Sequence, residues 1–264
     1  MDASIAVFAL IVFGSYALQT ITGFGSTLLL LTFGAHLLPI PEIVALAVPI
    51  SVMQSSYIGV RHRSGIDWKL LGARILPLMG GGLAVGFFAF RGVGAGWMQT
   101  AFAVLVLALS AREIVAMVRA ARAEPVAVPV PERGEAPPPS PAGPAALPKP
   151  IAALFVLAAG VIHGVYATGG PLLVYALGRS GLSKHAFRST LAIVWLVLDL
   201  VLTVSFTIDG RYDRQSLIRL AIIVPAMPLG VLVGEALHHR VDERRFRYLV
   251  FALLVAGALS LLAR

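Results

Sequence analysis

Apolar stretches alternate with short polar ones along almost the whole chain, in two sets of five. The first set falls at residues 3–20, 25–38, 43–60, 70–90 and 97–118, and the second at 151–166, 169–178, 187–208, 216–236 and 246–263. A helix needs about 20 apolar residues to cross the hydrocarbon core of a bilayer, within a range of roughly 17–25. Most stretches are long enough, but 25–38 is marginal and 169–178 is too short. The pattern predicts an all-α integral membrane protein.

The composition supports a membrane location and narrows the chemistry. Hydrophobic residues make up 58% of the chain and charged residues only 13%, whereas soluble domains carry about 25% charged residues. The chain has no cysteine, which excludes disulfides and thiolate metal sites, and no cofactor is expected. The net charge of +8 comes from short basic runs between apolar stretches. These runs indicate membrane topology and not nucleic-acid binding.

A proline-rich segment separates the two sets. Ten prolines fall between residues 125 and 150, with Glu and Arg among them. Such a segment has little apolar surface to bury and cannot propagate a helix. We therefore expect an N-terminal transmembrane repeat at 1–118, a solvated Pro-rich linker at 119–150 and a C-terminal transmembrane repeat at 151–264.

The two sets resemble each other in sequence as well as in hydropathy. Residues 25–29 align with 169–173, both beginning at a glycine and ending in Leu-Leu, and Gly34 then aligns with Gly178. Further along, Pro77, Gly82 and Gly86 have the same spacing as Pro225, Gly230 and Gly234. The agreement in order and spacing indicates an internal duplication, which is typical of transporter architecture.

The distribution of Lys and Arg selects between two topologies. With five segments in each half, 16 of the 21 Lys and Arg lie on one side, whereas four segments in each half reduce that number to 13. Basic residues concentrate in cytoplasmic loops, so five segments are favoured. An odd number inverts the second half relative to the first. We expect two inverted repeats with broken or re-entrant short helices, a cytoplasmic linker at 119–150 and both termini outside.

Each short stretch follows a glycine-rich break, at 23–25 and at 164–171. Unwound backbone survives at membrane depth only where protein or a water-filled cavity satisfies its polar groups. A helix that starts there presents free N–H groups that suit a small anion. Close helix packing is the other explanation for these glycines. The candidate substrate-binding residues are Gln19, Thr22, Gly23, Phe24, Gly25, Ser26, Thr27, Gln54, His163, Gly164, Tyr166, Thr168, Gly169, Gly170 and Pro171.

Two titratable residues stand out within the apolar stretches. Asp199 lies near the middle of 187–208, where a carboxylate costs about 2.5–3.5 kcal/mol on insertion scales, and His163 directly precedes the second break. Such residues mark proton or ion paths, so both are candidates for proton coupling. A neutral Asp hydrogen-bonded to a neighbouring helix and a purely structural His are the alternatives.

No enzyme motif is present: the chain lacks a phosphate-binding loop, paired zinc-binding histidines at helical spacing and a nucleophile elbow. The sequence therefore favours a secondary transporter that works by alternating access. A passive anion channel and an intramembrane enzyme or assembly factor without transport remain open.

The chain resembles the sulfite exporter TauE/SafE family. The resemblance is carried by the Gly23-Phe24-Gly25 break, the break at 164–171, Ile66-Asp67-Trp68 after a basic run, and the duplicated hydropathy. It implies a multi-pass carrier in the bacterial inner membrane for small sulfur-containing or organic anions. The implied partners are the lipid bilayer, such an anion and coupling protons, with no nucleic acid, and homo-oligomerisation is left open.

Overall fold

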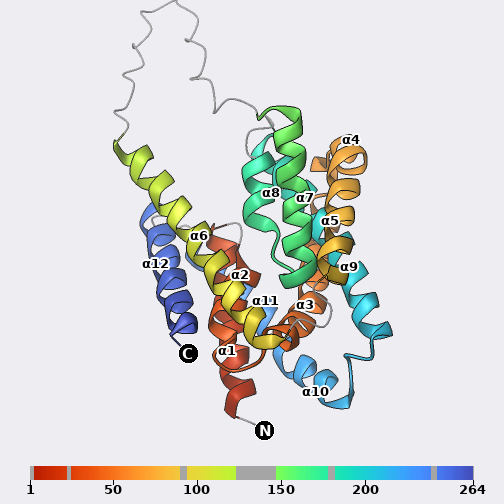
Figure 1. Cartoon of the computed structure of the whole chain (residues 1–264), viewed down its shortest axis with the longest axis vertical. Helices are drawn as coiled ribbons and strands as arrows, with labels where there is room; N and C mark the ends of the chain where they lie inside the picture. Colours follow the sequence, from red (N-terminus) through yellow and green to blue (C-terminus); the bar gives the residue numbers. More distant parts are fainter. Residues whose placement is uncertain are drawn as a thin grey trace, which may run out of the picture.

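All regular structure is helical in the described residues of the computed structural model, which are 3–22, 25–89, 94–122, 147–177, 182–238 and 243–263 (Figure 1). Within them, six helices are long and apolar enough to cross a membrane, and the apolar helices at 4–20 and 248–262 are shorter. The prediction of an all-α integral membrane protein is confirmed, and the chain is a multi-pass membrane protein.

The helices fall into two matching series. The first contains α1 (Ala3–Thr22), α2 (Ser26–Gly34), α3 (Ile40–Arg61), the short α4 (Trp68–Leu70), α5 (Leu76–Ala89) and α6 (Ala95–Arg122). The second contains α7 (Lys149–Tyr166), α8 (Gly170–Leu177), α9 (Lys184–Ile208), α10 (Arg214–Ile223), α11 (Ala226–His238) and α12 (Glu243–Leu262). Each series has five segments, because α4 continues through a π-helical turn into α5, and only a short turn separates α10 from α11.

The fourth segment of each half is interrupted next to a matched proline. In the first half the π-helical turn Leu71–Ile75 ends two residues before Pro77. In the second half, the single stretch expected at 216–236 is divided at Pro225, between α10 and α11. Proline lacks an N–H donor and its ring clashes with the carbonyl four residues before it. The two matched prolines therefore perturb the fourth segment of both halves. The result is a wider helical turn in the first half and a break in the second.

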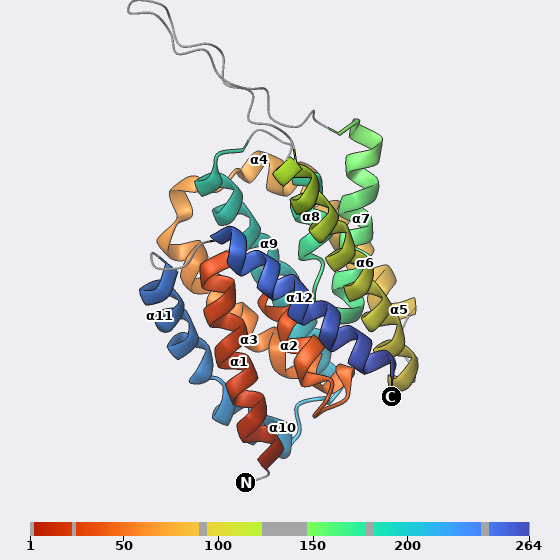
Figure 2. The same cartoon turned by 90° about the vertical axis from the view of Figure 1, so that its left-hand side faces the viewer.

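The two series run in opposite directions through the molecule. α1 begins at the lower end of Figures 1 and 2, where α12 also ends, whereas α7 begins at the opposite, upper end, where α6 ends. This arrangement is an inverted repeat with both chain ends on one side. α6 extends to Arg122 and α7 begins at Lys149, so helix occupies both edges of the segment expected as linker, and residues 123–146 lie outside the described part.

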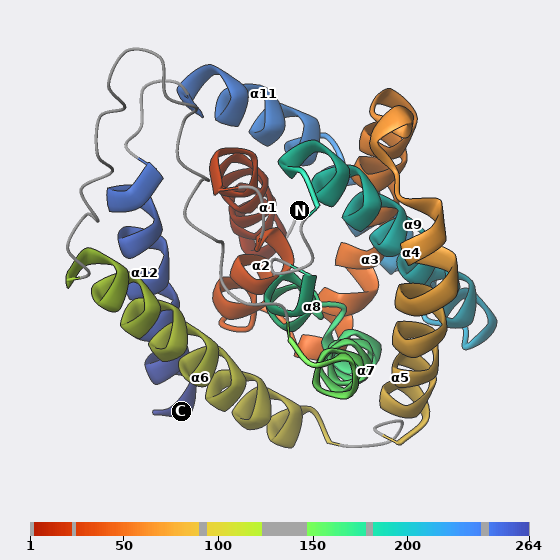
Figure 3. The same cartoon turned by 90° about the horizontal axis from the view of Figure 1, so that it is seen from above.

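The most extensive helix contacts join the two halves. α5 packs against α7, and the matched helices α11 and α1 pack in the same way, while α3 packs on α9 and α6 on α12 (Figure 3). Each of these pairs takes one helix from each series. The halves are therefore interlocked, and α5–α7 and α1–α11 form two equivalent cross-repeat pairs.

Glycines permit the close approach in both cross-repeat pairs. A Cβ at Gly82 would lie 2.2 Å from the Leu157 carbonyl oxygen, and one at Gly230 would lie 2.3 Å from the carbonyl oxygen of Phe13. Gly160 and Gly164 of α7 approach the backbone of α5 as closely. Small residues that allow backbones to touch are the usual basis of helix association in lipid. Close helix packing, which is the other explanation for the glycines near the breaks, thus applies to Gly164.

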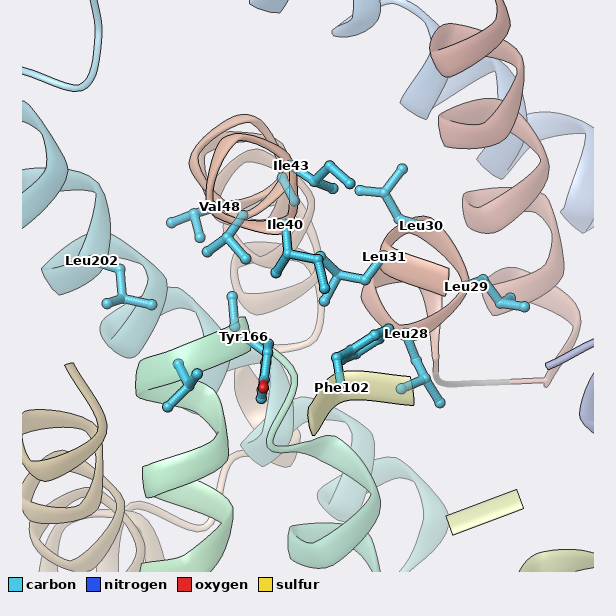
Figure 4. Packing of buried hydrophobic residues seen from close by; sticks show 14 of the residues in the cluster. Leu28, Leu29, Leu30, Leu31, Ile40, Ile43, Val48, Phe102, Tyr166 and Leu202 are labelled. Carbon is cyan, nitrogen blue, oxygen red and sulfur yellow. The ribbon is translucent and has the colours of Figure 1, made fainter. Parts of the chain in front are cut away.

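α2 lies inside the protein although it is apolar on every side. Leu28, Leu29, Leu30 and Leu31 are each at most 2% exposed and pack near Ile40, Phe102 and Tyr166 (Figure 4). The outer helices instead expose large apolar side chains, including Leu10, Phe88, Leu154, Ile208 and Leu232. An exterior of this kind suits lipid, and the surrounding protein allows a helix too short to span the bilayer to lie at membrane depth.

Candidate substrate and proton site

The backbone is interrupted at the matched place in both halves. α1 ends at Thr22 and α2 begins at Ser26 after Gly25, whose φ of 96° is left-handed. α7 ends at Tyr166, and Ala167, with a φ of 50°, closes it through an N–H bond of 2.7 Å to the His163 carbonyl. Non-glycine residues seldom adopt positive φ, and strain of this kind concentrates at functional sites.

The helices that follow the breaks are too short to cross the bilayer. α2 has nine residues and α8 has eight, which at about 1.5 Å per residue is roughly 12–14 Å, less than half of the hydrocarbon thickness of about 30 Å. The first N–H groups of each have no partner within the helix. Each half therefore places one helix start within the membrane interior.

A buried His–Asp pair lies beside the second break. Nε2 of His163 on α7 is 3.0 Å from Oδ1 of Asp199 on α9, and both side chains are almost fully buried. The two atoms are close enough for an ion pair but lack the alignment of a hydrogen bond. A charged group removed from water is expensive unless it is paired, which accounts for the burial of these two side chains next to each other.

Three neighbours orient this pair. The Trp195 ring stacks on the His163 ring at a centroid distance of 5.3 Å, and the Gly169 N–H donates to Nδ1 of His163 over 3.5 Å. On the other side, the Ser51 hydroxyl of α3 donates to Oδ2 of Asp199 over 2.5 Å. The site thus combines the second break, the α9 carboxylate and a first-half hydroxyl.

The first break reaches the same site through Tyr16. The Tyr16 hydroxyl on α1 lies within hydrogen-bonding reach of the Ser26 hydroxyl, at the start of α2, and is close enough to Asp199 to sense its charge. Tyr16, Ser26 and Asp199 are all buried. Tyr16 therefore links the start of α2 with the carboxylate that lies beside the second break.

An uncharged pair occupies the matched position of the first half. Gln19 lies six residues before Gly25, as His163 lies six residues before Gly169. The Gln19 side-chain amide donates to Oε1 of Gln54 on α3 over 3.3 Å, and Oε1 of Gln19 is buried without a partner. Each half therefore links its broken helix to its third segment, once through two amides and once through a His and an Asp.

The remaining candidates lie in different surroundings. Thr27 is half-buried and Thr168 is buried near the breaks. Gly170 lies beside the Trp195 ring and is followed by Pro171, within the first turn of α8. Gly23, Phe24 and the side chain of Thr22 lie outside the described residues.

Two candidates belong to helix packing and not to the break. Gly164 was expected within the break, but α7 continues through it to Tyr166, and a Cβ there would lie 2.3 Å from the Leu83 carbonyl oxygen of α5. The hydroxyl of Tyr166 donates to the Met98 carbonyl of α6 over 3.1 Å. The interruption of α7 is thus confined to residues 167–169.

Sequence reasoning missed Ser51, Trp195 and Tyr16. Each is an ordinary residue within an apolar helix, and only the packing of α3, α9 and α1 brings it to the pair. For Trp195, which lies four residues before Asp199 on α9, helical spacing provides a weak signal. Among the described residues no group of three or more His, Cys, Asp or Glu could hold a metal ion.

The two ends of the α3–α9 pair differ in charge. At the end nearer the linker, the ring of His62 meets the His185 ring edge-on at 5.5 Å. Burial and the positive groups of Arg188, His185 and Arg61 lower the pKa of His62. At the opposite end, Arg219 of α10 pairs with Glu42 of α3, and burial raises the pKa of Tyr212, which donates to the Ala45 carbonyl over 3.0 Å, to about 12.

Comparison with known proteins places this architecture in one family. The family described as "Sulfite exporter TauE/SafE" matches residues 7–261. The chain is also 22% identical over 259 residues to the "Probable sulfite/organosulfonate exporter TauE" of Cupriavidus necator, covering 96% of this chain and 91% of that protein. No solved structure gives a significant match. Family and relative point to a transporter, not an enzyme, and the chain belongs to the sulfite exporter TauE/SafE family.

Proposed function

We propose that this protein is a secondary transporter that moves a small sulfur-containing or organic anion across the bacterial inner membrane by alternating access. The observation that carries the proposal is the meeting of two oppositely oriented broken segments at one buried polar site. The sulfite/organosulfonate label of the Cupriavidus necator relative supports the substrate class, and the absence of a phosphate-binding loop fits a carrier without a nucleotide motor.

The anion binds between the starts of α2 and α8 in this proposal. Backbone N–H groups and the positive ends of the helix dipoles attract negative charge. Ser26 and the Gln19–Gln54 pair supply neutral polar groups from the first half. Hydroxyl and amide donors replace part of the hydration that the anion loses. The bilayer supplies the surroundings, and homo-oligomerisation is not needed to complete the site.

The His163–Asp199 pair carries the coupling proton. It is the described ionisable pair that lies buried next to a helix break, and its neighbours on three elements hold it in place. Intramembrane His and Asp groups serve as proton relays in pumps and transporters. Protonation of the pair changes the charge beside the anion site, which links the two binding events.

The cross-repeat pairs provide the moving parts. α1–α11 and α5–α7 are each held together by glycine contacts, and one break follows the α1 member and the other the α7 member of these pairs. Rocking of one pair against the other would open the site alternately to the two sides, as inverted repeats do in other carriers. The basic end at His62, His185 and Arg188 would attract anions toward the cytoplasmic opening.

Reconstituted protein tests this function. We expect purified protein in proteoliposomes to take up labelled sulfite or methanesulfonate and to show counterflow, in which unlabelled anion inside accelerates entry of label. Asp199→Asn should remain folded and lose the dependence of uptake on pH, with Asp213→Asn at the exposed N-cap of α10 as the matched control.

Other results would point to the other functions. Flux far above about 10³ per second without counterflow indicates a channel. No uptake together with a stably co-purifying protein indicates an assembly factor or enzyme. An unchanged pH profile in Asp199→Asn removes that residue from proton coupling. A thermal-shift series with sulfite, thiosulfate, sulfonates and carboxylates then ranks substrates, because selective binding stabilises the folded state.

A further inference from the structure

We infer that Nδ1 of His163 accepts the coupling proton, and that its protonation releases the Gly169 N–H so that one proton and one singly charged oxyanion bind together. This inference rests on the proposed transport function and makes it specific. It predicts a sulfonate-like monoanion as substrate, in preference to a dianion, and electroneutral transport with one proton per anion.

The hydrogen bonds define which nitrogen is available. Nδ1 accepts from the Gly169 N–H over 3.5 Å, so in this arrangement the ring proton is on Nε2, which faces Oδ1 of Asp199 at 3.0 Å. The carboxylate also accepts from Ser51. Nδ1 is therefore the ring atom that can take up a further proton, while Nε2 stays next to the Asp199 carboxylate.

Protonation of Nδ1 changes two donors at once. An imidazolium nitrogen donates and cannot accept, so the Gly169 N–H loses its partner when Nδ1 gains a proton. The new N–H of His163 and the released N–H of Gly169 then lie side by side, directly before the start of α8. Two adjacent donors fit two oxygens of one sulfonate or hydrogensulfite group, and the positive charge on the ring strengthens both bonds.

The local packing keeps these donors together. A Cβ at Gly169 would lie 2.3 Å from the Ala159 carbonyl oxygen, so this position requires glycine to bring its N–H so near the ring. The Trp195 ring stacks on the His163 ring, and the face of an aromatic ring attracts a cation. Pro171 lacks an N–H, which leaves Gly170 and Leu172 as the further donors of the first turn.

The surrounding charges set the proton count at one. Of the elements packed against the pair, α5 has no titratable residue, α1 contributes Tyr16, and Tyr175 of α8 lies under Arg112. Arg63 lies in the short turn between α3 and α4, and Arg74 in the π-helical turn between α4 and α5. A phenol has an ordinary pKa of about 10 and stays neutral. Among the described residues, His163 and Asp199 are the ionisable pair that lies buried beside the second break.

Charge balance then selects the substrate. One proton on Nδ1 adds one positive charge and a monoanion adds one negative charge, so the net charge of the site is the same when empty and when loaded. A dianion would leave one extra negative charge in the membrane interior, where each uncompensated charge costs several kcal/mol. Both forms of the carrier can therefore reorient for a sulfonate but not for sulfate.

Proteoliposomes with a trapped pH dye and a potassium–valinomycin voltage clamp test the inference. We expect one proton to enter per methanesulfonate, uptake that is independent of membrane potential, and little uptake of sulfate. His163→Gln should lose the coupling of proton entry to methanesulfonate entry, whereas Asp213→Asn, at the exposed N-cap of α10 and away from the site, should keep the ratio of one.

A binding measurement on the wild-type protein keeps the test independent of how the variants fold. Linkage to one proton predicts that the Kd for methanesulfonate falls about tenfold for each unit of pH decrease above the titration of the site. Counterflow without proton entry, current-carrying uptake, a pH-independent Kd or a preference for sulfate would overturn the inference while leaving the transport function intact. Absence of counterflow would instead overturn the transport function itself.

Discussion

The two halves of the molecule share a scaffold but not the chemistry placed on it. In both, a broken segment starts a short helix, and a polar residue six positions before the matched glycine contacts the third segment. That residue is Gln19 in the first half and His163 in the second, with Gln54 and Asp199 as their respective partners. The first half thus holds a pair of neutral amides, and the second half holds a pair of ionisable side chains.

The difference shows how a duplicated fold can divide two tasks. Inverted symmetry requires only that the two halves can exchange conformations. That exchange depends on the backbone breaks and the glycine contacts, and both halves have them. The side chains at the breaks are free to diverge. A neutral amide pair can orient an anion in every state of the cycle, whereas a titratable pair can tie its binding to proton supply.

The largest expected contrast is in the stability of the two pairs. Replacing His163 with Leu leaves the buried Asp199 carboxylate without the imidazole that faces it, and removing one partner of a buried ionisable pair costs about 3–5 kcal/mol. Replacing Gln19 with Leu removes an interhelical hydrogen bond between neutral groups, for which membrane-protein measurements give about 0.6–1.7 kcal/mol. Unfolding of each variant in detergent, followed by circular dichroism, measures both values.

A double variant distinguishes a charged pair from simple packing. If His163→Leu is costly because Asp199 is left alone, then adding Asp199→Leu should recover part of the lost stability. Equal losses in His163→Leu and Gln19→Leu would show that the Asp199 carboxylate depends on His163 no more than one neutral amide depends on the other, and the electrostatic difference between the halves would be refuted.

The next largest effect on stability concerns the glycine contacts that both halves share. Gly82→Ala and Gly230→Ala each place a methyl group within 2.3 Å of a carbonyl oxygen of the partner helix, and overpacking of this kind costs about 1–3 kcal/mol. The two losses should be similar, because α5–α7 and α1–α11 are equivalent pairs. Gly81→Ala is the matched control, since nothing lies within 4 Å of its added Cβ. A loss in Gly81→Ala as large as in Gly82→Ala would refute the packing explanation.

The sequence predicted the scaffold better than the site. Hydropathy and the matched glycines are local signals, and they located the helices, the breaks after Thr22 and Tyr166, and the five-segment halves. Gly164 was assigned to the break because its glycine signal looks the same whether the residue unwinds a helix or lets α5 approach it.

The partners of the site residues could not be predicted in the same way. Asp199 and His163 stand out in apolar sequence, but the Ser51 hydroxyl that contacts Asp199 lies in the other half of the chain, and its contact depends on how α3 crosses α9. The same holds for Gln19 and Gln54, two candidates whose mutual hydrogen bond no spacing rule indicates. Such pairings are properties of tertiary packing.

The smallest expected effect is a titration at the linker end of the α3–α9 pair, where the last residues of α3 meet the start of α9. His62 has a lowered pKa because it is partly desolvated and faces Arg188, His185 and Arg61. A lowered pKa keeps the His62 imidazole neutral near pH 7, so the arginines and not His62 supply the positive charge of this end at that pH. Arg188→Gln removes the strongest of the charge effects, and the pKa of His62 should rise toward its ordinary value, as followed by NMR of labelled histidine in micelles.

Arg74→Gln is the matched control for this titration, because Arg74 is exposed and is not among the groups that shift His62. The titration of His62 is worth measuring because the two ends of the α3–α9 pair differ in how their arginines are paired. There Arg219 has Glu42 as a partner, whereas no described ion pair neutralises Arg61 or Arg188. If Arg188→Gln leaves the pKa of His62 unchanged, the basic groups do not act together, and the linker end has no stronger attraction for an anion than the paired end.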